Sequence, residues 1–466
     1  MPHSADERFD AVIIGSGQAG NPLAVAFANA GRRTVLIERE HVGGTCINEG
    51  CTPTKTMIAS ARTAYVVARA ADYGVDGGRA VVDLAAVRDR KREIVESFRS
   101  GSERRLNETE GLTLVIGEAH FAGAHRIEVD LRGGGRRAIT APLIFLNTGT
   151  RPARPELPGL GGIEALDSTS IMELDAVPEH LVILGGGYVG VEFGQMFRRF
   201  GSRVTVVQRR DRLLPREDPD IASAVEGILR DEGIAIELGA EAREIIARGD
   251  GAFSLVVRRG DGERRIDGTR LLFAAGRRPN TDRLRPAAAG VEIDERGYVR
   301  VNGRLETNVP GIYALGDVNG GPAFTHVSYD DHRIVRANLL EGGAATTEGR
   351  LIPYTVFLDP QLGRVGWTET EARAAGRAVR VARMPMRHVA RALEVGEPRG
   401  AIKAIVDPAS ERILGAAVLG IEGGELMAVL QTAMIASLPY TALRDGIFAH
   451  PTLAESLNNL FTSFDE

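Results

Sequence analysis

Two stretches of this chain repeat one pattern: a short apolar strand, a glycine-rich turn, a helical run and a second strand. The strands expected at 9–14 and 180–184 each run into a G-x-G-x-x-G turn. The first glycine of such a turn permits the sharp bend, the second lets the backbone approach a pyrophosphate, and the third lets helix and strand pack closely. The pattern predicts two Rossmann-like dinucleotide-binding domains in an α/β fold. The glycines are Gly15, Gly17 and Gly20 in the first copy and Gly185, Gly187 and Gly190 in the second.

The residue that ends the second strand differs between the two copies. In the first copy, Glu38 follows the glycines by about 20 residues, where a carboxylate accepts hydrogen bonds from a ribose. In the second copy, the same place holds Gln208, Arg209 and Arg210, which offer two guanidiniums and no carboxylate. Guanidiniums suit the 2′-phosphate of NADPH, so the second site is expected to prefer NADPH to NADH. The alternative is that Arg209 and Arg210 are solvated residues of a loop.

Cysteine is confined to one place in the chain. The 2 cysteines, Cys46 and Cys51, lie between glycines at the start of a helical run expected at 53–70. Such a pair predicts a redox dithiol, because a thiol at a helix N-terminus ionises more readily than a free cysteine. Lys55 lies one turn further along the same face. A zinc site would need more ligands than the nearby His41, and a structural disulfide closing so short a loop would restrict the unfolded chain little.

Length and charge narrow the function classes. A chain of 466 residues is too long for one compact core, so two or three domains are expected. Its net charge of -5 leaves no electrostatic footprint for nucleic acid, and its arginine-rich stretches at 88–92 and 209–216 are expected to be solvated. No apolar run of about 18 residues predicts a membrane span, and no apolar leader is visible near the N-terminus. We therefore expect a cytoplasmic protein without nucleic-acid or membrane partners.

Three further segments, at 143–150, 271–280 and 311–317, are each predicted to be a strand that ends in a turn or an acidic residue. A proline-rich stretch at 151–159 follows one of them and is typical of a crossing between domains. The last part of the chain, from about residue 351, has no glycine fingerprint and mixes strands at 401–407 and 413–420 with a helix near 425–437, which indicates a separate α+β unit. The earlier segments are 143–150 with Thr148 and Gly149, 271–280 with Gly276, and 311–317 with Asp317.

These motifs occur in a definite order along the chain. Two glycine turns enclose the G-G-T-C-x4-C-x-P-x-K segment, and A-G-R-x-P-N, G-D and a late H-P-T with a glutamate follow. In this the chain resembles the pyridine nucleotide-disulfide oxidoreductases over essentially its whole length. Glutathione reductase, dihydrolipoyl dehydrogenase and mercuric reductase belong to that family. The segments 46–57 and 389–393 look most like the mercuric reductase-like branch.

The resemblance implies a division into domains and a set of cofactor contacts. An FAD-binding domain would comprise 1–153 and 278–345, an NAD(P)H-binding domain at 154–277 would be inserted in it, and a C-terminal dimerisation domain would comprise 346–466. Asp317 would lie near the ribityl chain of FAD. The implied cofactor-binding residues are Gly15, Gly17, Gly20, Glu38, Thr148, Gly149, Asp317, Gly185, Gly187, Tyr188, Gly190, Arg209, Arg210 and Gly276.

The resemblance also implies the path of the electrons, from NADPH to FAD, to a Cys46–Cys51 disulfide and on to substrate. Cys51 would be the thiol in charge transfer with the flavin, and Cys46 the thiol that attacks substrate. Lys55 would stand at the flavin N5 and pair with Glu192. Tyr188 would cover the nicotinamide pocket and swing aside.

The late segment 449–455 places His450 ahead of Glu455. A carboxylate fixes the tautomer of an imidazole and raises its basicity, so His450 is expected to deprotonate Cys46 and to protonate a leaving thiol. In the family this histidine comes from the partner subunit, which implies a homodimer.

Departures from the family pattern bear on the substrate. Mercuric reductases carry a C-terminal cysteine pair and tend to have tyrosine where this chain has His450, and this chain ends without cysteine. Dihydrolipoyl dehydrogenase fits the His450–Glu455 pair but typically has an acid where Gln208 stands. We expect a reductase of a disulfide or a soft metal ion, with no resident metal. The alternatives are a dihydrolipoyl dehydrogenase, or a redox or metal sensor that turns over poorly.

Overall fold

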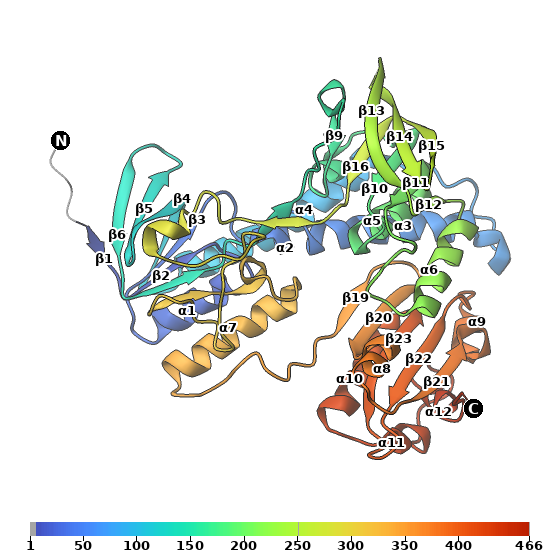
Figure 1. Ribbon diagram of the computed structural model, residues 1–466. Helices are drawn as coiled ribbons and strands as arrows, with labels where there is room; N and C mark the ends of the chain where they lie inside the picture. The colour runs from blue at the N-terminus through green and yellow to red at the C-terminus, as the bar shows by residue number, and fades with distance from the viewer. Residues whose placement is uncertain (1–5, 250, 466) are drawn as a thin grey trace. The chain divides into compact units, whose positions relative to one another are not determined.

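The computed structural model describes residues 6–249 and 251–465, and Figure 1 shows their helices and strands. By its internal contacts the chain divides into two compact units. The three-domain division expected from the sequence stays a prediction. Within the described residues, no helix is long and apolar enough to cross a membrane. Unit 1 comprises Met1–Thr56, Arg88–Ala153 and Gly276–Arg350, and unit 2 comprises Met57–Val87, Arg154–Ala275 and Leu351–Glu466.

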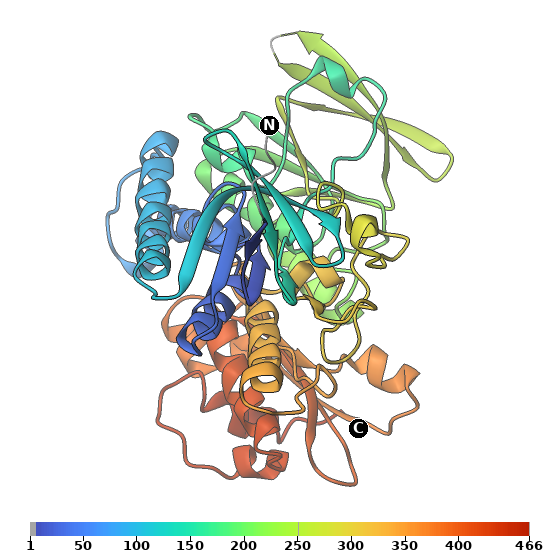
Figure 2. The same ribbon diagram turned by 90° about the vertical axis from the view of Figure 1, so that its left-hand side faces the viewer.

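An eight-stranded sheet forms the centre of unit 1. Strands β4, β3, β2, β7 and β18 run parallel, whereas β5 pairs antiparallel with β4 and β6. Helices α1 (Gly20–Asn29) and α7 (Thr325–Leu340) pack against each other and lie side by side in both views (Figures 1 and 2). The strands are, in sheet order, β1 (Glu7–Arg8), β6 (Arg136–Thr140), β5 (Arg126–Leu131), β4 (Leu112–Gly123), β3 (Thr34–Glu38), β2 (Ala11–Ile14), β7 (Leu143–Leu146) and β18 (Ile312–Ala314).

The strand order places a switch point beside β2. Strands β3 and β7 pair with opposite edges of β2, so the chain continues to one side of β2 first and to the other side later. All four residues of β2 are buried and apolar, as expected of a parallel strand covered on both faces. In such sheets ligands bind outside the carboxyl ends of the strands at a switch point. The first glycine turn begins there, at Gly15.

Helix α4 (Leu84–Asn107) carries the arginine-rich stretch 88–92. Most of that stretch is exposed or half-buried, but Lys91 is only 3% exposed. The expectation of a solvated stretch is therefore wrong at Lys91. A charged residue on a helix can be buried in this way when the apolar methylene groups of its long side chain pack against other residues.

Unit 2 contains a second parallel sheet. Its strand β10 is buried along its whole length and pairs with β11 on one side and β16 on the other. Helix α5 (Tyr188–Phe200) packs on β10 and β11, and α6 (Pro219–Asp231) follows β11 in the chain. The two parallel sheets confirm the predicted pair of Rossmann-like regions. In order, the strands are β12 (Ala235–Leu238), β11 (Arg203–Gln208), β10 (His180–Leu184), β16 (Arg270–Phe273) and β9 (Ala165–Leu166).

Two antiparallel sheets complete unit 2 and lie at its opposite ends in Figure 1. One is formed by β13 (Glu241–Gly249), β14 (Ala252–Arg259) and β15 (Gly262–Gly268). The other has the order β19 (Tyr354–Val356), β20 (Gln361–Gly366), β23 (Ile413–Gly420), β22 (Ala401–Val406) and β21 (Arg380–Pro385), and α10 (Gly423–Ile435) packs on β20 and β23. This confirms the C-terminal α+β unit. Its remaining helices are α8 (Glu369–Ala374), α9 (Ala390–Glu394), α11 (Tyr440–Arg444) and α12 (Ser456–Leu460).

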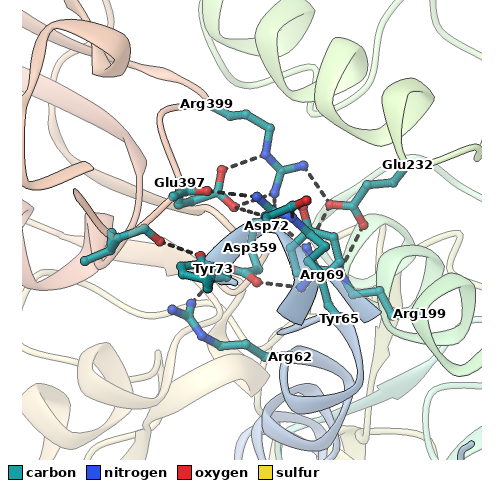
Figure 3. A network of polar contacts seen from close by, with 12 residues as sticks. Arg62, Tyr65, Arg69, Asp72, Tyr73, Arg199, Glu232, Asp359, Glu397 and Arg399 are labelled. Atoms are coloured by element: carbon teal, nitrogen blue, oxygen red, sulfur yellow. Dashed lines mark hydrogen bonds and ion pairs between the residues drawn. The ribbon is translucent and has the colours of Figure 1, made fainter. Parts of the chain in front are cut away.

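A network of buried charges joins distant stretches of unit 2 (Figure 3). Arg199 on α5 donates to both carboxylate oxygens of Glu232, at 2.9 and 2.8 Å, and its Nη1 lies 2.5 Å from Asp359 Oδ2. Arg399, just before β22, donates to the same Glu232 at 2.8 Å. The guanidinium of Arg199 stands 3.8 Å from the centroid of the Tyr65 ring, which belongs to α3 (Cys51–Ala68). Paired ions thus link the parallel sheet of unit 2, through α5, to the C-terminal sheet.

Candidate active site

The two cysteines lie where two helices of the active-site segment meet. Cys46 is half-buried in the short helix α2 (Gly44–Asn48), and Cys51 is the exposed first residue of α3, so the predicted helix start is confirmed. Both are free thiols. The pKa of Cys46 is raised far above its usual value, first by its hydrogen bond to Cys51 and then by burial, while Thr325 and Lys55 act in the opposite direction. Of the two thiols, Cys46 is thereby the harder to ionise.

A hydroxyl from another part of unit 1 contacts this pair. Thr325 is the first residue of α7, and its Oγ1 lies 3.2 Å from Cys51 Sγ. A hydroxyl that donates to a thiolate stabilises its charge. Sequence analysis missed Thr325, because nothing in the chain near Cys51 indicates that a residue 274 positions later returns to it.

The first glycine turn is packed as a dinucleotide fold requires. Gly15 has φ +101°, and a Cβ on Gly20 would lie 2.1 Å from the carbonyl oxygen of Gly15, so the turn and helix α1 meet without side chains. Asn147, at the end of β7, locks this turn: its Oδ1 accepts from the Gly20 N–H at 2.9 Å, and its Nδ2 donates to Leu315 O at 2.9 Å. Asn147 is a second residue that sequence analysis did not single out.

Glu38 ends β3 beside the same turn. Its Oε2 accepts from the backbone N–H of Ser16 at 3.0 Å and from the Ser16 hydroxyl at 2.6 Å, and its Oε1 accepts from the Glu40 N–H at 2.8 Å. These bonds fix the carboxylate at the carboxyl end of the sheet. Each oxygen keeps acceptor capacity there for the hydroxyls of a ribose.

Other predicted residues of unit 1 gather around the ends of β7 and β18. Asp317 accepts a hydrogen bond from Thr150 Oγ1 at 2.9 Å, and Arg277 donates to the same hydroxyl at 2.7 Å. Two side-chain oxygens here are buried and have no hydrogen-bond partner within the described residues: Oγ1 of Thr148, and Oδ1 of Asn21, which follows the glycine turn. Buried polar atoms are normally satisfied, so these orphaned atoms fit a polar cofactor such as FAD. Next to them, a Cβ on Gly149 or Gly276 would meet nothing within 4 Å.

The second glycine turn repeats this geometry in unit 2. Gly185 has φ +117°, and a Cβ on Gly190 would lie 1.9 Å from Gly185 O, whereas a Cβ on Gly187 would meet nothing within 4 Å. The middle glycine thus leaves room for the close approach of a pyrophosphate. At the end of β11, Arg209 and Arg210 are exposed, and neither side chain forms an ion pair within 6–249 and 251–465.

Of the remaining predicted catalytic residues, three belong to unit 2 and one, Lys55, belongs to unit 1. Glu192 on α5 is 7% exposed, and its Oε1 accepts from the Phe357 N–H at 2.7 Å. Lys55 belongs to unit 1, and its pairing with Glu192 stays a prediction. His450 and Glu455 are brought together as expected: Nδ1 lies 2.8 Å from one carboxylate oxygen and 3.0 Å from the other.

Fold and site together define an enzyme class, the flavin- and pyridine nucleotide-dependent oxidoreductases with a redox dithiol. Residues 9–331 match the family described as pyridine nucleotide-disulphide oxidoreductase, and residues 352–461 match the dimerisation domain of the same family. This chain belongs to the pyridine nucleotide-disulfide oxidoreductases, as the resemblance implied. Members of the family use FAD and NAD(P)H.

The relatives span several activities. The chain is 41% identical over 459 residues, covering 98% of it and 99% of the relative, to a probable pyridine nucleotide-disulfide oxidoreductase, RclA, of Escherichia coli. It is 35% identical to a mercuric reductase of Streptomyces lividans and 34% identical to a dihydrolipoyl dehydrogenase of Haloferax volcanii, in each case over 96% of this chain and 94% of the relative. Among solved structures, the HOCl-induced flavoprotein disulfide reductase RclA from Escherichia coli superposes with a TM-score of 0.88, at 40% identity, over 97% of this chain and 99% of that one.

Proposed function

We propose that this enzyme passes electrons from NADPH through FAD to the Cys46–Cys51 pair and on to a disulfide or a soft metal ion. One observation carries the proposal: the two thiols of the chain, one in α2 and one at the start of α3, lie in hydrogen-bond contact within the unit that holds the first glycine turn. FAD, when bound, accepts two electrons from the pyridine nucleotide and can deliver both to a disulfide. Reduction of the disulfide takes up two electrons and two protons and leaves two thiols.

The surroundings of the two thiols support the proposed division of roles between them. The pKa of Cys46 is raised by its hydrogen bond to Cys51 and by burial, so a base would favour its attack on a substrate disulfide. We infer that His450 supplies this base, held by Glu455 and contributed by the other subunit of a homodimer. Cys51 then remains the thiolate beside the flavin, with Lys55 and Thr325 close to the pair.

The proposed domains are an FAD-binding domain at 1–153 and 278–345, an inserted NADPH-binding domain at 154–277 and a C-terminal domain at 346–466. The homodimer would form through the C-terminal domain. The C-terminal region exposes large apolar side chains, among them Ile435, Leu438 and Ile447. Apolar surface of this kind commonly marks a protein interface. The matching dimerisation domain of the family supports the same assignment.

NADPH is the proposed electron donor because Arg209 and Arg210 are exposed, unpaired guanidiniums within the described residues. Gln208, at the place of the ribose-binding acid, turns away and donates to Arg212 O at 3.2 Å. The nearest carboxylate along the chain, Asp211, lies 3.3 Å from the guanidinium of Arg212.

For the substrate, the relatives support two chemistries. One solved relative is described as a flavoprotein disulfide reductase and another structure of it as a Cu(II) complex, while other relatives are mercuric reductases. Thiolates bind soft metals tightly, so both substrates fit a reduced Cys46–Cys51 pair. The second candidate, dihydrolipoyl dehydrogenase, is favoured by the His450–Glu455 pair and by a relative of that name.

The test is an anaerobic titration of the FAD-loaded protein with NADPH, followed by steady-state turnover with a panel of disulfides, dihydrolipoamide with NAD⁺, and soft metal ions. Wild type should gain a long-wavelength charge-transfer band on two-electron reduction. Cys51→Ser should lack the band, whereas Cys46→Ser should show it without reduction, because Cys51 remains as a lone thiolate.

The outcomes separate the candidates. Continuous NADPH oxidation with one substrate class identifies the reductase, and turnover of dihydrolipoamide alone identifies the dehydrogenase. Oxidation of a single equivalent followed by arrest would show a sensor. If Cys46→Ser and Cys51→Ser behave alike, the assigned roles of the two thiols are wrong.

A further inference from the structure

A buried carboxylate lies between two tyrosine hydroxyls next to the second glycine turn. The side chain of Glu217 has no exposed surface (0%). Its Oε1 accepts from the Tyr354 hydroxyl at 2.6 Å and from the Tyr188 hydroxyl at 3.2 Å. The centroids of the two tyrosine rings are 5.4 Å apart. All three residues belong to unit 2.

The charge of Glu217 is only partly compensated. Burial raises the pKa of Glu217, and hydrogen bonds from Tyr354, the charge of Arg364 and the hydrogen bond from Tyr188 oppose that shift. Arg364 Nε is 3.5 Å from Oε2, but Arg364 Nη1 donates to backbone carbonyls of Val365 and Ala416. Within the described residues Oε2 accepts no hydrogen bond. The tyrosine hydroxyls are therefore the principal donors to this carboxylate.

The three residues come from segments that meet at the nucleotide turn. Tyr188 is the first residue of α5 and directly follows Gly187. Glu217 ends a loop that packs on the same turn, since Leu214 N–H donates to Gly186 O at 2.9 Å and the Glu217 N–H donates to Leu214 O at 2.9 Å. Tyr354 begins β19 of the C-terminal sheet. The first turn of α5 is the place where the pyrophosphate of a dinucleotide rests in such domains.

We propose that Glu217 is a positioning residue: its hydrogen bond with the Tyr188 hydroxyl keeps Tyr188 in place at the second nucleotide site, and its hydrogen bond with the Tyr354 hydroxyl fixes Glu217 itself. We call this arrangement of Tyr188, Glu217 and Tyr354 the latch. The two hydrogen bonds to Glu217 differ in length. The 2.6 Å bond ties Glu217 to the C-terminal sheet, and the 3.2 Å bond to Tyr188 is the one that opens when a nucleotide enters. The proposal rests on the proposed binding of NADPH at this turn.

The latch makes a definite prediction about affinity. If the latched conformation must open before a nucleotide binds, the measured affinity is reduced by the fraction of molecules that are open. Removing the bond therefore tightens binding. One intramolecular hydrogen bond corresponds to about a two- to tenfold change in a dissociation constant.

The experiment measures the dissociation constant of NADP⁺ for the FAD-loaded full-length protein by isothermal titration calorimetry, without turnover. Tyr188→Phe and Glu217→Gln should each lower it about two- to tenfold. Tyr188→Phe removes this hydrogen bond, whereas Glu217→Gln keeps an acceptor oxygen and only weakens the bond by removing the charge. The double variant should therefore gain no more than Tyr188→Phe alone. Tyr440→Phe is the matched control: it removes the hydroxyl of another buried tyrosine of unit 2, on α11, and should leave NADP⁺ binding unchanged.

Each result has a clear meaning. Unchanged or weaker NADP⁺ binding in Tyr188→Phe, or fully additive effects in the double variant, would overturn the latch. Tyr188→Phe keeps the ring and decides the matter alone if Glu217→Gln does not fold. A wild type that fails to bind NADP⁺ at all would instead defeat the proposed function.

Discussion

Replacing Arg199 by methionine should destabilise unit 2 strongly. The Arg199 side chain is 4% exposed, and it pairs with the carboxylates of Glu232 and Asp359, which are 8% and 9% exposed. Methionine keeps much of the side-chain volume but removes every donor. Both carboxylates would then lose a buried partner, which is more damaging than the loss of the attraction itself.

The magnitude follows from what remains in the network. Breaking a buried pair by removing one partner typically costs about 3–5 kcal/mol. Arg399 still donates to Glu232, and Arg62 still donates to Asp359 at 2.8 Å, so neither carboxylate is left without a cation. We therefore expect the lower end of the range, about 3 kcal/mol, including the lost contact with the face of Tyr65.

The assay is urea unfolding of the FAD-loaded protein at one fixed protein concentration, because oligomerisation shifts apparent stability. The control is Arg444→Met, which removes an exposed pair: Arg444 and Asp445 are 36% and 63% exposed. Solvent screens that exposed pair, so its loss should shift the unfolding midpoint much less. Equal shifts of the unfolding midpoint in the two variants would refute the reasoning, since burial would then not matter.

Two further changes test the assignment of single residues. Arg209→Glu should lower kcat/KM for NADPH by about tenfold or more and hardly affect NADH, because hydrogen bonds between charged groups contribute about 1.5–3 kcal/mol; a wild-type enzyme that prefers NADH would contradict the assigned cofactor. His450→Ala should slow disulfide turnover by about 10²–10⁴-fold through the loss of general acid–base catalysis, while stopped-flow reduction of the flavin by NADPH stays near wild type. A fall in both half-reactions would indicate that His450 has a structural role.

Features set by neighbouring residues could be predicted from the sequence. The turns at Gly15 and Gly185 and the helix start at Cys51 each depend on a few adjacent positions, namely an apolar strand, glycines and a helical run. The His450–Glu455 pair was found for the same reason, because its members are close in the chain.

Features set by distant residues could not be predicted. Thr325 is 274 positions from Cys51, Asn147 is 127 from Gly20, and Tyr354 is 137 from Glu217. A single sequence carries no local sign of such contacts, which depend on how strands and helices pack. Within 209–216, Leu213 and Leu214 are almost fully buried, although the surrounding arginines suggested a solvated loop.

The contact between Cys46 and Cys51 also has a consequence for the oxidation of either thiol. A cysteine oxidised to sulfenic acid is consumed irreversibly by further oxidation unless a second thiol condenses with it. Whichever of the two is oxidised first, the other is its hydrogen-bonded neighbour, and condensation gives the disulfide and one water. The chain has 2 cysteines in all, so no third sulfhydryl competes for the sulfenic acid or misdirects the bond. Oxidation of either thiol thereby ends in the disulfide, the state that the proposed electron transfer would reduce again.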